Sequence, residues 1–129
     1  MNDKEKFNKE MEKYFEQENL ELGPWTSESM VNDPKHLAFV LSRYKFVAKM
    51  LEGRESVLEV GCGDAFGVPV VAQAVGRLYT IDWEERLIND NLKRLHFLNN
   101  VEFIQSDINL APISTVTVDA IYNIDFIEH

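Results

Sequence analysis

The sequence has little of what marks several classes of protein. Its 129 residues include one cysteine, Cys62, so no disulfide can form within the chain, which agrees with a reducing compartment. Four prolines and six glycines argue against a fibrous or disordered chain. No apolar run approaches the roughly 20 residues that span a bilayer, and the N-terminus is charged where a signal peptide is apolar. We therefore expect a soluble, cytoplasmic, globular chain.

Basic residues are also scarce. Thirteen Lys and Arg against 22 Asp and Glu give a formal net charge of −9. This charge opposes the phosphate contacts on which nucleic-acid binding depends, so we expect a small-molecule partner, with no nucleic acid and no membrane. No metal-ligand spacing is present. The local basic clusters are expected to be solvated helix faces: Arg43, Lys45 and Lys49, and Lys93 and Arg94.

Residues 1–53 are predicted to form a helical segment. Residues 3–19 carry an apolar stripe at helical spacing, typical of a packing or lid helix, that consists of Phe7, Met11, Tyr14 and Phe15. The stretch LGPWTSES breaks that helix and is expected to leave Trp25 on a loop, as a core plug or a ligand cover. A second helix is predicted from Asn32 or Asp33, with Pro34 in its first turn, to near Gly53. Its apolar packing face is expected to consist of Leu37, Val40, Leu41, Tyr44, Val47, Ala48 and Leu51.

After residue 53 the apolar period changes, which indicates a second unit over residues 54–129. Short, largely buried strands are predicted at residues 56–60, 77–82, 101–107 and 118–124. Helices are expected between them at about 67–75 and 84–98, and the link INLAPISTVT is expected to be mostly loop. Strands that alternate with helices imply an α/β fold with a parallel sheet.

The stretch VLEVGCGDAFG, residues 57–67, places a glycine-rich turn after the first strand. Gly61 and Gly63 would let the backbone approach a ligand at the carboxyl end of the sheet. A dinucleotide fingerprint would have its third glycine at the position of Phe66. A pyrophosphate would also face Glu59 and Asp64, at a cost on the order of 1 kcal/mol or more. The acids therefore favour a ligand with positive charge.

An acidic residue at the end of the second strand supplies the other half of the expected site. Asp82 stands 21 residues after Gly61, where a carboxylate can accept hydrogen bonds from both hydroxyls of a ribose. The predicted ligand therefore has a ribose beside a cation. S-adenosylmethionine has both, because its sulfonium and ammonium groups replace the phosphates of NAD.

Four stretches in order resemble the motifs of class I S-adenosylmethionine-dependent methyltransferases. They are VLEVGCGDAFG, LYTIDW, FIQSDI and DAIYNIDFIEH, and together they cover residues 56–129. The resemblance implies a Rossmann-like open sheet of order 3-2-1-4 with two N-terminal helices, incomplete relative to the seven strands of the family. The fourth strand would then be an unpaired edge, so we expect self-association or a partner chain there.

The resemblance also implies roles for residues at three strand ends. Glu59, Gly61 and Gly63 would line the methionine part of the cofactor. Asp82 would bind the ribose hydroxyls, and Trp83 would lie against the adenine. The product would be S-adenosylhomocysteine.

Further roles fall on the third and fourth strands. Asp107 would meet the adenine amino group, and the amide of Ile108 would meet a ring nitrogen. Asn123 would contact the amino-acid end of the cofactor through its backbone. Asp125 and Phe126 would face the methyl-transfer pocket.

Two residues of the turn are expected to be small fillers. Cys62 is assigned to the cofactor-binding turn and not to nucleophilic catalysis, since no partnered histidine is identifiable nearby. Ala65 replaces the third glycine of the family motif, which is tolerable if its φ is negative. His36 and His96 lie in predicted helices and are expected to be structural or solvated. His129, in the family-like segment IEH, is expected to be a packing residue or to lie at a truncation, with a catalytic base there as the alternative, so no catalytic base is named.

The predicted function is methyl transfer from S-adenosylmethionine to a small-molecule acceptor. Three alternatives stay open. The chain could be a non-catalytic cofactor-binding half that needs a partner, an NAD-type nucleotide-binding oxidoreductase, or a protein-interaction domain that uses its N-terminal helices.

Overall fold

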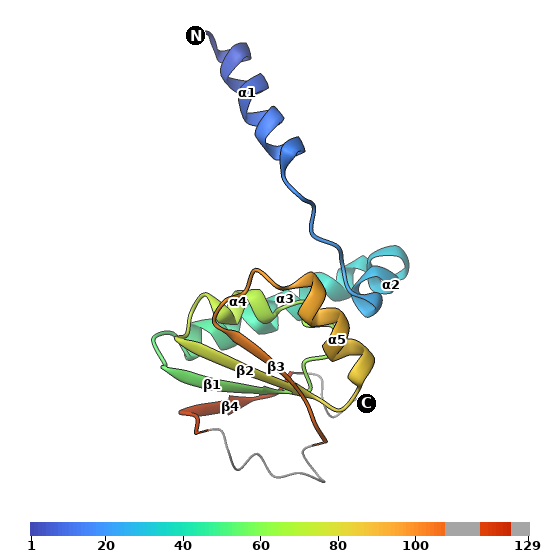
Figure 1. Ribbon diagram of the computed structural model, residues 1–129, viewed down its shortest axis with the longest axis vertical. Coiled ribbons are helices and arrows are strands. Elements are labelled where there is room, and N and C mark those ends of the chain that lie inside the picture. Colours follow the sequence, from blue (N-terminus) through green and yellow to red (C-terminus); the bar gives the residue numbers. More distant parts are fainter. Residues whose placement is uncertain (108–116, 125–129) are drawn as a thin grey trace.

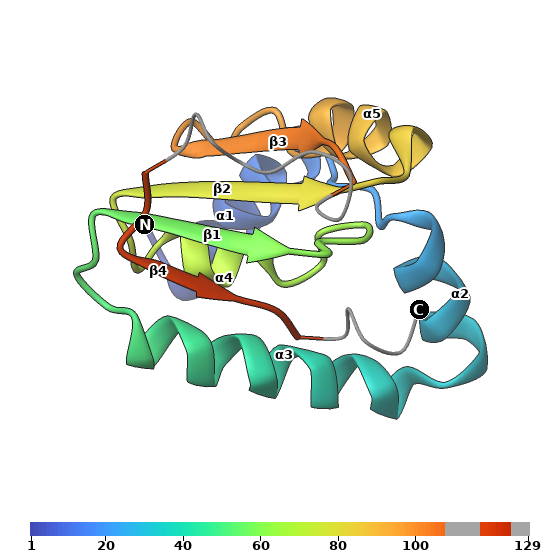
Figure 2. The ribbon, with the colours of Figure 1, turned by 90° about the horizontal axis from the view of Figure 1, so that it is seen from below.

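A four-stranded parallel sheet forms the centre of the molecule in this computed structural model, which describes residues 1–107 and 117–124. Its strands, in the order β3-β2-β1-β4 (Figure 2), are β1 (Ser56–Val60), β2 (Arg77–Asp82), β3 (Val101–Gln105) and β4 (Ala120–Tyr122). The predicted order 3-2-1-4 and the Rossmann-like fold class are therefore confirmed. The last two strands are shorter than expected, and most of the predicted loop between them lies outside the described residues.

Three helices cover one face of the sheet: α3 (Pro34–Met50), α4 (Val68–Ala72) and α5 (Glu85–Arg94), as Figure 1 shows. The main core lies between this face and the helices, where Val57, Val68 and Leu78 are completely buried. Leu58 and Ile81 form a smaller cluster on the opposite face, because successive side chains of a strand point to opposite faces. As predicted, α3 turns its stripe inward, and the chain leaves it through Gly53, whose φ is 84°.

The first helix, α1 (Asp3–Glu16), extends away from this body in Figure 1. Asn2 caps it by accepting a hydrogen bond from the amide of Glu5 at 2.9 Å. Its predicted apolar stripe is present, but Phe7, Tyr14 and Phe15 are more than half exposed and no residue of α1 is buried. The expectation of a packing or lid helix is therefore wrong for this structure, because no described surface lies against the stripe. None of the described helices is long and apolar enough to cross a membrane.

The stretch around Trp25 also differs from the prediction. Gly23 and Pro24, interpreted as breakers, instead begin a helix, α2 (Pro24–Asn32), with Gly23 as N-cap and Pro24 in the first turn. Proline suits that position because the first amides of a helix have no intrahelical acceptor. Trp25 is therefore helical and 48% exposed, so it is not a core plug.

Candidate functional site

The glycine-rich turn follows the carboxyl end of β1 and is anchored to β2. The amides of Gly61 and Cys62 donate to the carbonyl oxygen of Ile81 at 2.8 and 3.3 Å. Gly61 has a φ of 77° and Gly63 one of 56°, so both occupy the left-handed region that glycine adopts without steric cost. Ala65 has a φ of 61°, so the condition under which alanine was expected to be tolerable here, a negative φ, is not met. Its methyl group is buried, and the left-handed backbone costs an alanine about 1–2 kcal/mol.

Asp82, at the carboxyl end of β2, joins this turn to the start of α5. Its Oδ2 accepts from the amide of Gly63 at 3.0 Å, and its Oδ1 accepts from the amide of Glu84 at 3.0 Å. A carboxylate offers about four lone-pair sites, so both oxygens keep one for a ligand. The carboxylate therefore has capacity for two hydroxyl donors while it holds the turn.

Glu59 is fully buried at the end of β1, between two tyrosines from different elements. The hydroxyl of Tyr44, on α3, donates to Glu59 Oε1, and that of Tyr122, on β4, donates to Oε2 at 3.3 Å. Burial, and then the charge of Glu59, raises the pKa of both tyrosines. Burial, and then Glu59, also raises the pKa of the Cys62 thiol, which agrees with a filler rather than a nucleophile.

The second acid of the turn, Asp64, binds the N-terminus of α2. Its Oδ2 accepts from the amide of Thr26 at 2.7 Å, and Asp64 is buried. The N-cap of α2 is Gly23, which has no side chain to accept this bond. Asp64 thus supplies the negative charge that a helix N-terminus favours.

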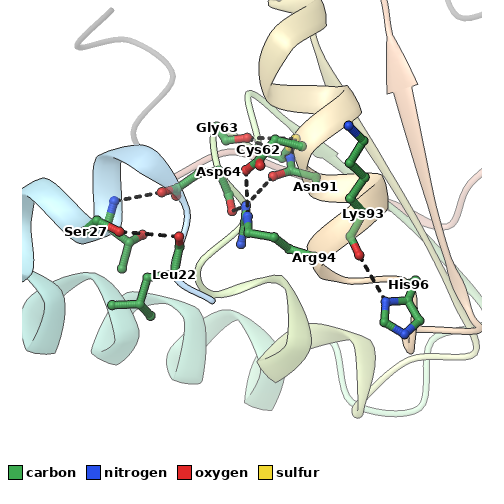
Figure 3. Close-up of polar contacts among 11 residues, drawn as sticks. Leu22, Ser27, Cys62, Gly63, Asp64, Asn91, Lys93, Arg94 and His96 are labelled. Carbon is green, nitrogen blue, oxygen red and sulfur yellow. Dashed lines mark hydrogen bonds and ion pairs between the residues drawn. The ribbon is translucent and has the colours of Figure 1, made fainter. Parts of the chain in front are cut away.

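Helix α5 holds the other side of the turn through two polar side chains (Figure 3). Asn91 is fully buried and donates to the carbonyl oxygen of Gly63 at 2.9 Å. Arg94 donates from Nη2 to the carbonyl oxygen of Asp64 and to Asn91 Oδ1, both at 2.8 Å. Its side chain is 9% exposed and pairs with Asp90 at 2.6 Å, so the expectation of a solvated Arg94 is wrong.

A cavity of about 120 Å³ lies between the turn and helices α2 and α3. Trp25 covers one side of it, because a Cβ at Gly63 would meet the indole at 2.8 Å. His36, which was expected to be structural or solvated, is one of the residues that line it. The lining residues are Trp25, Thr26, Ser29, His36, Leu37, Val40, Tyr44, Gly61, Cys62, Gly63, Asp64 and Phe66.

The remaining predicted site residues lie at the neighbouring strand ends and outside this cavity. Trp83 follows β2 and is mostly exposed, and its carbonyl oxygen accepts from Gln105 at 2.9 Å. Asp107 lies after β3 and is half-buried, and Asn123 lies after β4 and is exposed. Four further positions lie outside the described residues: Ile108, Asp125, Phe126 and His129. Within the described part of the chain, no three His, Cys, Asp or Glu side chains gather as a metal site.

The sequence interpretation missed the residues that hold the turn and its acids. Tyr44 was assigned to a packing face, although a hydroxyl on that buried face required a partner. Asn91 shares a helix face with Leu87 and Ile88, and that polar residue among leucines was the available signal. Thr26 gave no signal, because its bond to Asp64 uses the backbone.

A model of the methyltransferase domain matches residues 57–129. This chain belongs to the methyltransferase domain family. A probable S-adenosylmethionine-dependent methyltransferase of Mycobacterium tuberculosis is 26% identical over 107 residues, which are 81% of this chain and 38% of that protein. One of Mycolicibacterium smegmatis is 28% identical over 86 residues, 67% of this chain and 32% of that protein. This chain thus spans less than two-fifths of either curated relative.

Solved structures give the same fold. A SAM-dependent methyltransferase from Aquifex aeolicus is 31% identical with a TM-score of 0.58, over 74% of this chain and 53% of that one. A coclaurine N-methyltransferase, bound to N-methylheliamine and SAH, is 26% identical with a TM-score of 0.55, over 67% of this chain and 26% of that one. The Rossmann-like fold of class I methyltransferases is therefore the fold of this family member.

Proposed function

We propose that this chain binds S-adenosylmethionine on the acidic glycine turn and forms the cofactor-binding part of a methyltransferase. The observation that carries the proposal is the Asp82 carboxylate, which ends β2 and accepts from the amide of Gly63 with lone pairs to spare. Membership of the methyltransferase domain family and relatives that carry this cofactor in their names support it.

The chemistry of the donor set fits this cofactor. S-adenosylmethionine carries two positively charged groups, a sulfonium and an ammonium. Both would be attracted to the buried carboxylate of Glu59 beside the turn. Its ribose hydroxyls suit the acceptor capacity that remains on Asp82. A dinucleotide would place a pyrophosphate near Glu59 and Asp64, so the acids count against the NAD alternative.

The contacts expected from the resemblance are kept as proposals. Glu59, Gly61 and Gly63 would contact the methionine part, with Cys62 filling the turn behind them. Asp82 would bind the ribose. The adenine contacts would come from Trp83, Asp107 and Ile108, and the amino-acid end would also meet the backbone of Asn123.

The residues of the chain would act mainly by positioning. When bound, the cofactor supplies a methyl group on a sulfonium whose departure requires no proton. The turn would fix that group, and Trp25 with α3 would shield its surroundings from water. Asp82 and Asn91 hold the turn from two sides, through the amide and the carbonyl oxygen of Gly63.

A small-molecule acceptor is the second part of the proposal. The net charge of −9 disfavours a nucleic acid. The cavity beside the turn is lined by aromatic and small side chains, as small-molecule sites usually are. A relative that is 26% identical was solved with N-methylheliamine, which is such a molecule.

We also propose that the edge strand β4 pairs with further polypeptide, a second copy or a partner chain. Among the described strands β4 pairs with β1 alone, and Ile121 at its centre is 64% exposed. Unpaired edges of this kind recruit strands. Sedimentation that shows a monodisperse monomer at high concentration would count against pairing between copies.

Calorimetric titration with S-adenosylhomocysteine, with NAD titrated separately, tests cofactor binding. Asp82→Asn removes the charge and one acceptor, so affinity should fall about tenfold or more. Glu85→Gln, an exposed acid in the first turn of α5, is the matched control and should bind as the wild type does. Binding of NAD without S-adenosylhomocysteine would refute the proposal.

A further inference from the structure

Helix α1 carries an apolar stripe that no described part of its own chain covers. Phe7, Tyr14 and Phe15 are more than half exposed, and Phe15 reaches 83%. Met11, which completes the stripe, is not buried either. A helix of 14 residues has little stability in water without a surface for such a face, because most helical stability in proteins comes from packing. A stable α1 therefore requires a partner surface.

A second uncovered apolar stripe lies on the outer face of α3. It consists of Phe39, Phe46 and Met50, which are all more than half exposed. Their spacings of seven and four positions place them on one side of the helix, as spacings of four and three do for Phe7, Met11 and Tyr14. The buried residues of α3 occupy the other side: Leu37, Val40, Tyr44 and Ala48. In Figure 2, α3 runs along the margin of the molecule, so its outer face points away from the sheet.

The charged side chains beside the two stripes have opposite signs. Helix α3 contains no acidic residue, and basic side chains lie beside its outer stripe: Lys35, Arg43 and Lys49. The guanidinium of Arg43 stacks over the Phe39 ring at 4.6 Å, which brings positive charge onto the stripe itself. Acidic side chains lie beside the stripe of α1: Asp3, Glu10 and Glu12. Lys4 lies at the N-terminal end of that stripe, so the opposite charges can meet mainly along the later turns of α1.

This distribution of charge favours one pairing of the stripes over the others. Two α3 faces would bring basic side chains together, and like charges that face each other disfavour a contact. Two α1 faces would leave the α3 stripe uncovered. Packing of α1 against α3 brings acids to bases and buries both apolar stripes.

We propose that α1 of a second copy of this chain packs on the outer face of α3, and that the exchange is reciprocal. Helix α1 extends away from its own body in Figure 1, and residues 17–23 separate it from α2, so it is placed to reach another copy. Two identical α1–α3 contacts related by a two-fold axis form a closed dimer, and exchange of an element is a low-cost route to one. This surface is separate from the β4 edge, and the inference does not depend on the cofactor.

Sedimentation equilibrium of the 129-residue chain over a range of concentrations tests this dimer with two variants. Phe7→Lys puts a positive charge into the α1 stripe, against the basic α3, and Phe46→Glu puts a negative charge into the α3 stripe, against the acidic α1. The wild type should be a dimer, and each variant alone should have a dissociation constant at least about tenfold higher. An equimolar mixture of the two variants should regain the dimer, because one of its α1–α3 pairs is wild type at both helices.

Two control variants make the same changes of charge away from the stripes. Glu16→Gln lies on the opposite side of α1 from Phe7, and Lys45→Gln lies to the side of the outer stripe of α3. Both should dimerise as the wild type does. All four substituted side chains are exposed, so circular dichroism should show a folded chain in every variant.

The mixture separates exchange of α1 between copies from the other arrangements. Recovery of the dimer in the mixture, after its loss in each variant alone, would support the exchange. A wild type that is monomeric at every concentration would overturn the inference. A dimer retained in either variant would overturn it as well, because the contact would then lie on one helix alone or elsewhere, as at β4. Variants that stay monomeric when mixed would show that α1 and α3 do not pair between copies, with the same consequence.

Discussion

The side-chain amide of Asn91 donates a hydrogen bond of 2.9 Å to the carbonyl oxygen of Gly63. The amide of the same glycine donates in the opposite sense to Asp82 at 3.0 Å. The backbone of Gly63 is therefore held by a side-chain amide from α5 and a carboxylate from β2. A turn that is fixed in this way needs little further ordering when a ligand binds.

Loss of the α5 contact should reduce stability. Asn91→Ala leaves the buried carbonyl oxygen of Gly63 without this donor. The free energy of unfolding, measured by urea denaturation, should therefore fall by about 1–3 kcal/mol. Asn89→Ala, an exposed asparagine on the same helix, controls for helix propensity and should change it by less than about 0.5 kcal/mol. Equal effects of the two substitutions would contradict the importance of this bond.

Two glycine substitutions separate steric overlap from backbone strain. Gly67→Ala should lower the free energy of unfolding by about 1–3 kcal/mol or more, because its Cβ meets the Tyr44 ring while its φ of −95° is ordinary. The Cβ of Gly53→Ala would meet no atom within 4 Å, but the φ there is 84°. Backbone strain alone should therefore lower the free energy of unfolding by about 1–2 kcal/mol. A Gly67→Ala protein as stable as the wild type would show that Tyr44 is not held where we describe it.

The Cys62 thiol should resist alkylation in the folded protein. Burial and the neighbouring Glu59 raise its pKa, so its thiolate fraction at pH 8 lies below that of an exposed cysteine. Mass spectrometry after iodoacetamide treatment should find little modification of the native chain and complete modification in denaturant. Rapid labelling under native conditions would disagree with this environment.

Glu84, the N-cap of α5, should titrate at unusually low pH. Hydrogen bonds from the Arg86 side chain and backbone lower its pKa from 4.5 to about 2. Since the folded pKa lies below the ordinary value, its contribution to stability is present above about pH 4.5 and is lost as the pH falls towards 2. Carboxyl NMR should show this titration, and Arg86→Gln should return it towards the ordinary range. An unchanged Glu84 titration in Arg86→Gln would contradict the stated cause.

Much of the fold could be predicted because it follows from local periodicity. The switch from a helical stripe in α3 to short apolar runs gave the bounds of β1 and β2, and the sheet order came with the family resemblance. Asp82 could be predicted for the same reason, since the carboxyl ends of parallel strands meet at one edge.

The residues that support the site could not be predicted in this way, because their roles depend on contacts between distant segments. Asp64 and Thr26 are 38 positions apart, and Glu59 and Tyr122 are 63 apart. The positive φ of Ala65 could not be predicted either, because alanine by itself disfavours the left-handed region. The start of α2 was missed because proline both ends helices and begins them.

The central claim, that the ligand lies on the acidic glycine turn, is tested most directly by a ¹H–¹⁵N correlation spectrum of the chain during titration with S-adenosylhomocysteine. We expect the amide signals of Gly61 and Gly63 to shift and saturate together. Those of Gly53 and Gly76, at the opposite ends of the strands, should stay in place. Saturable binding that leaves Gly61 and Gly63 unmoved would contradict the claim, and so would a folded chain whose spectrum does not change at all.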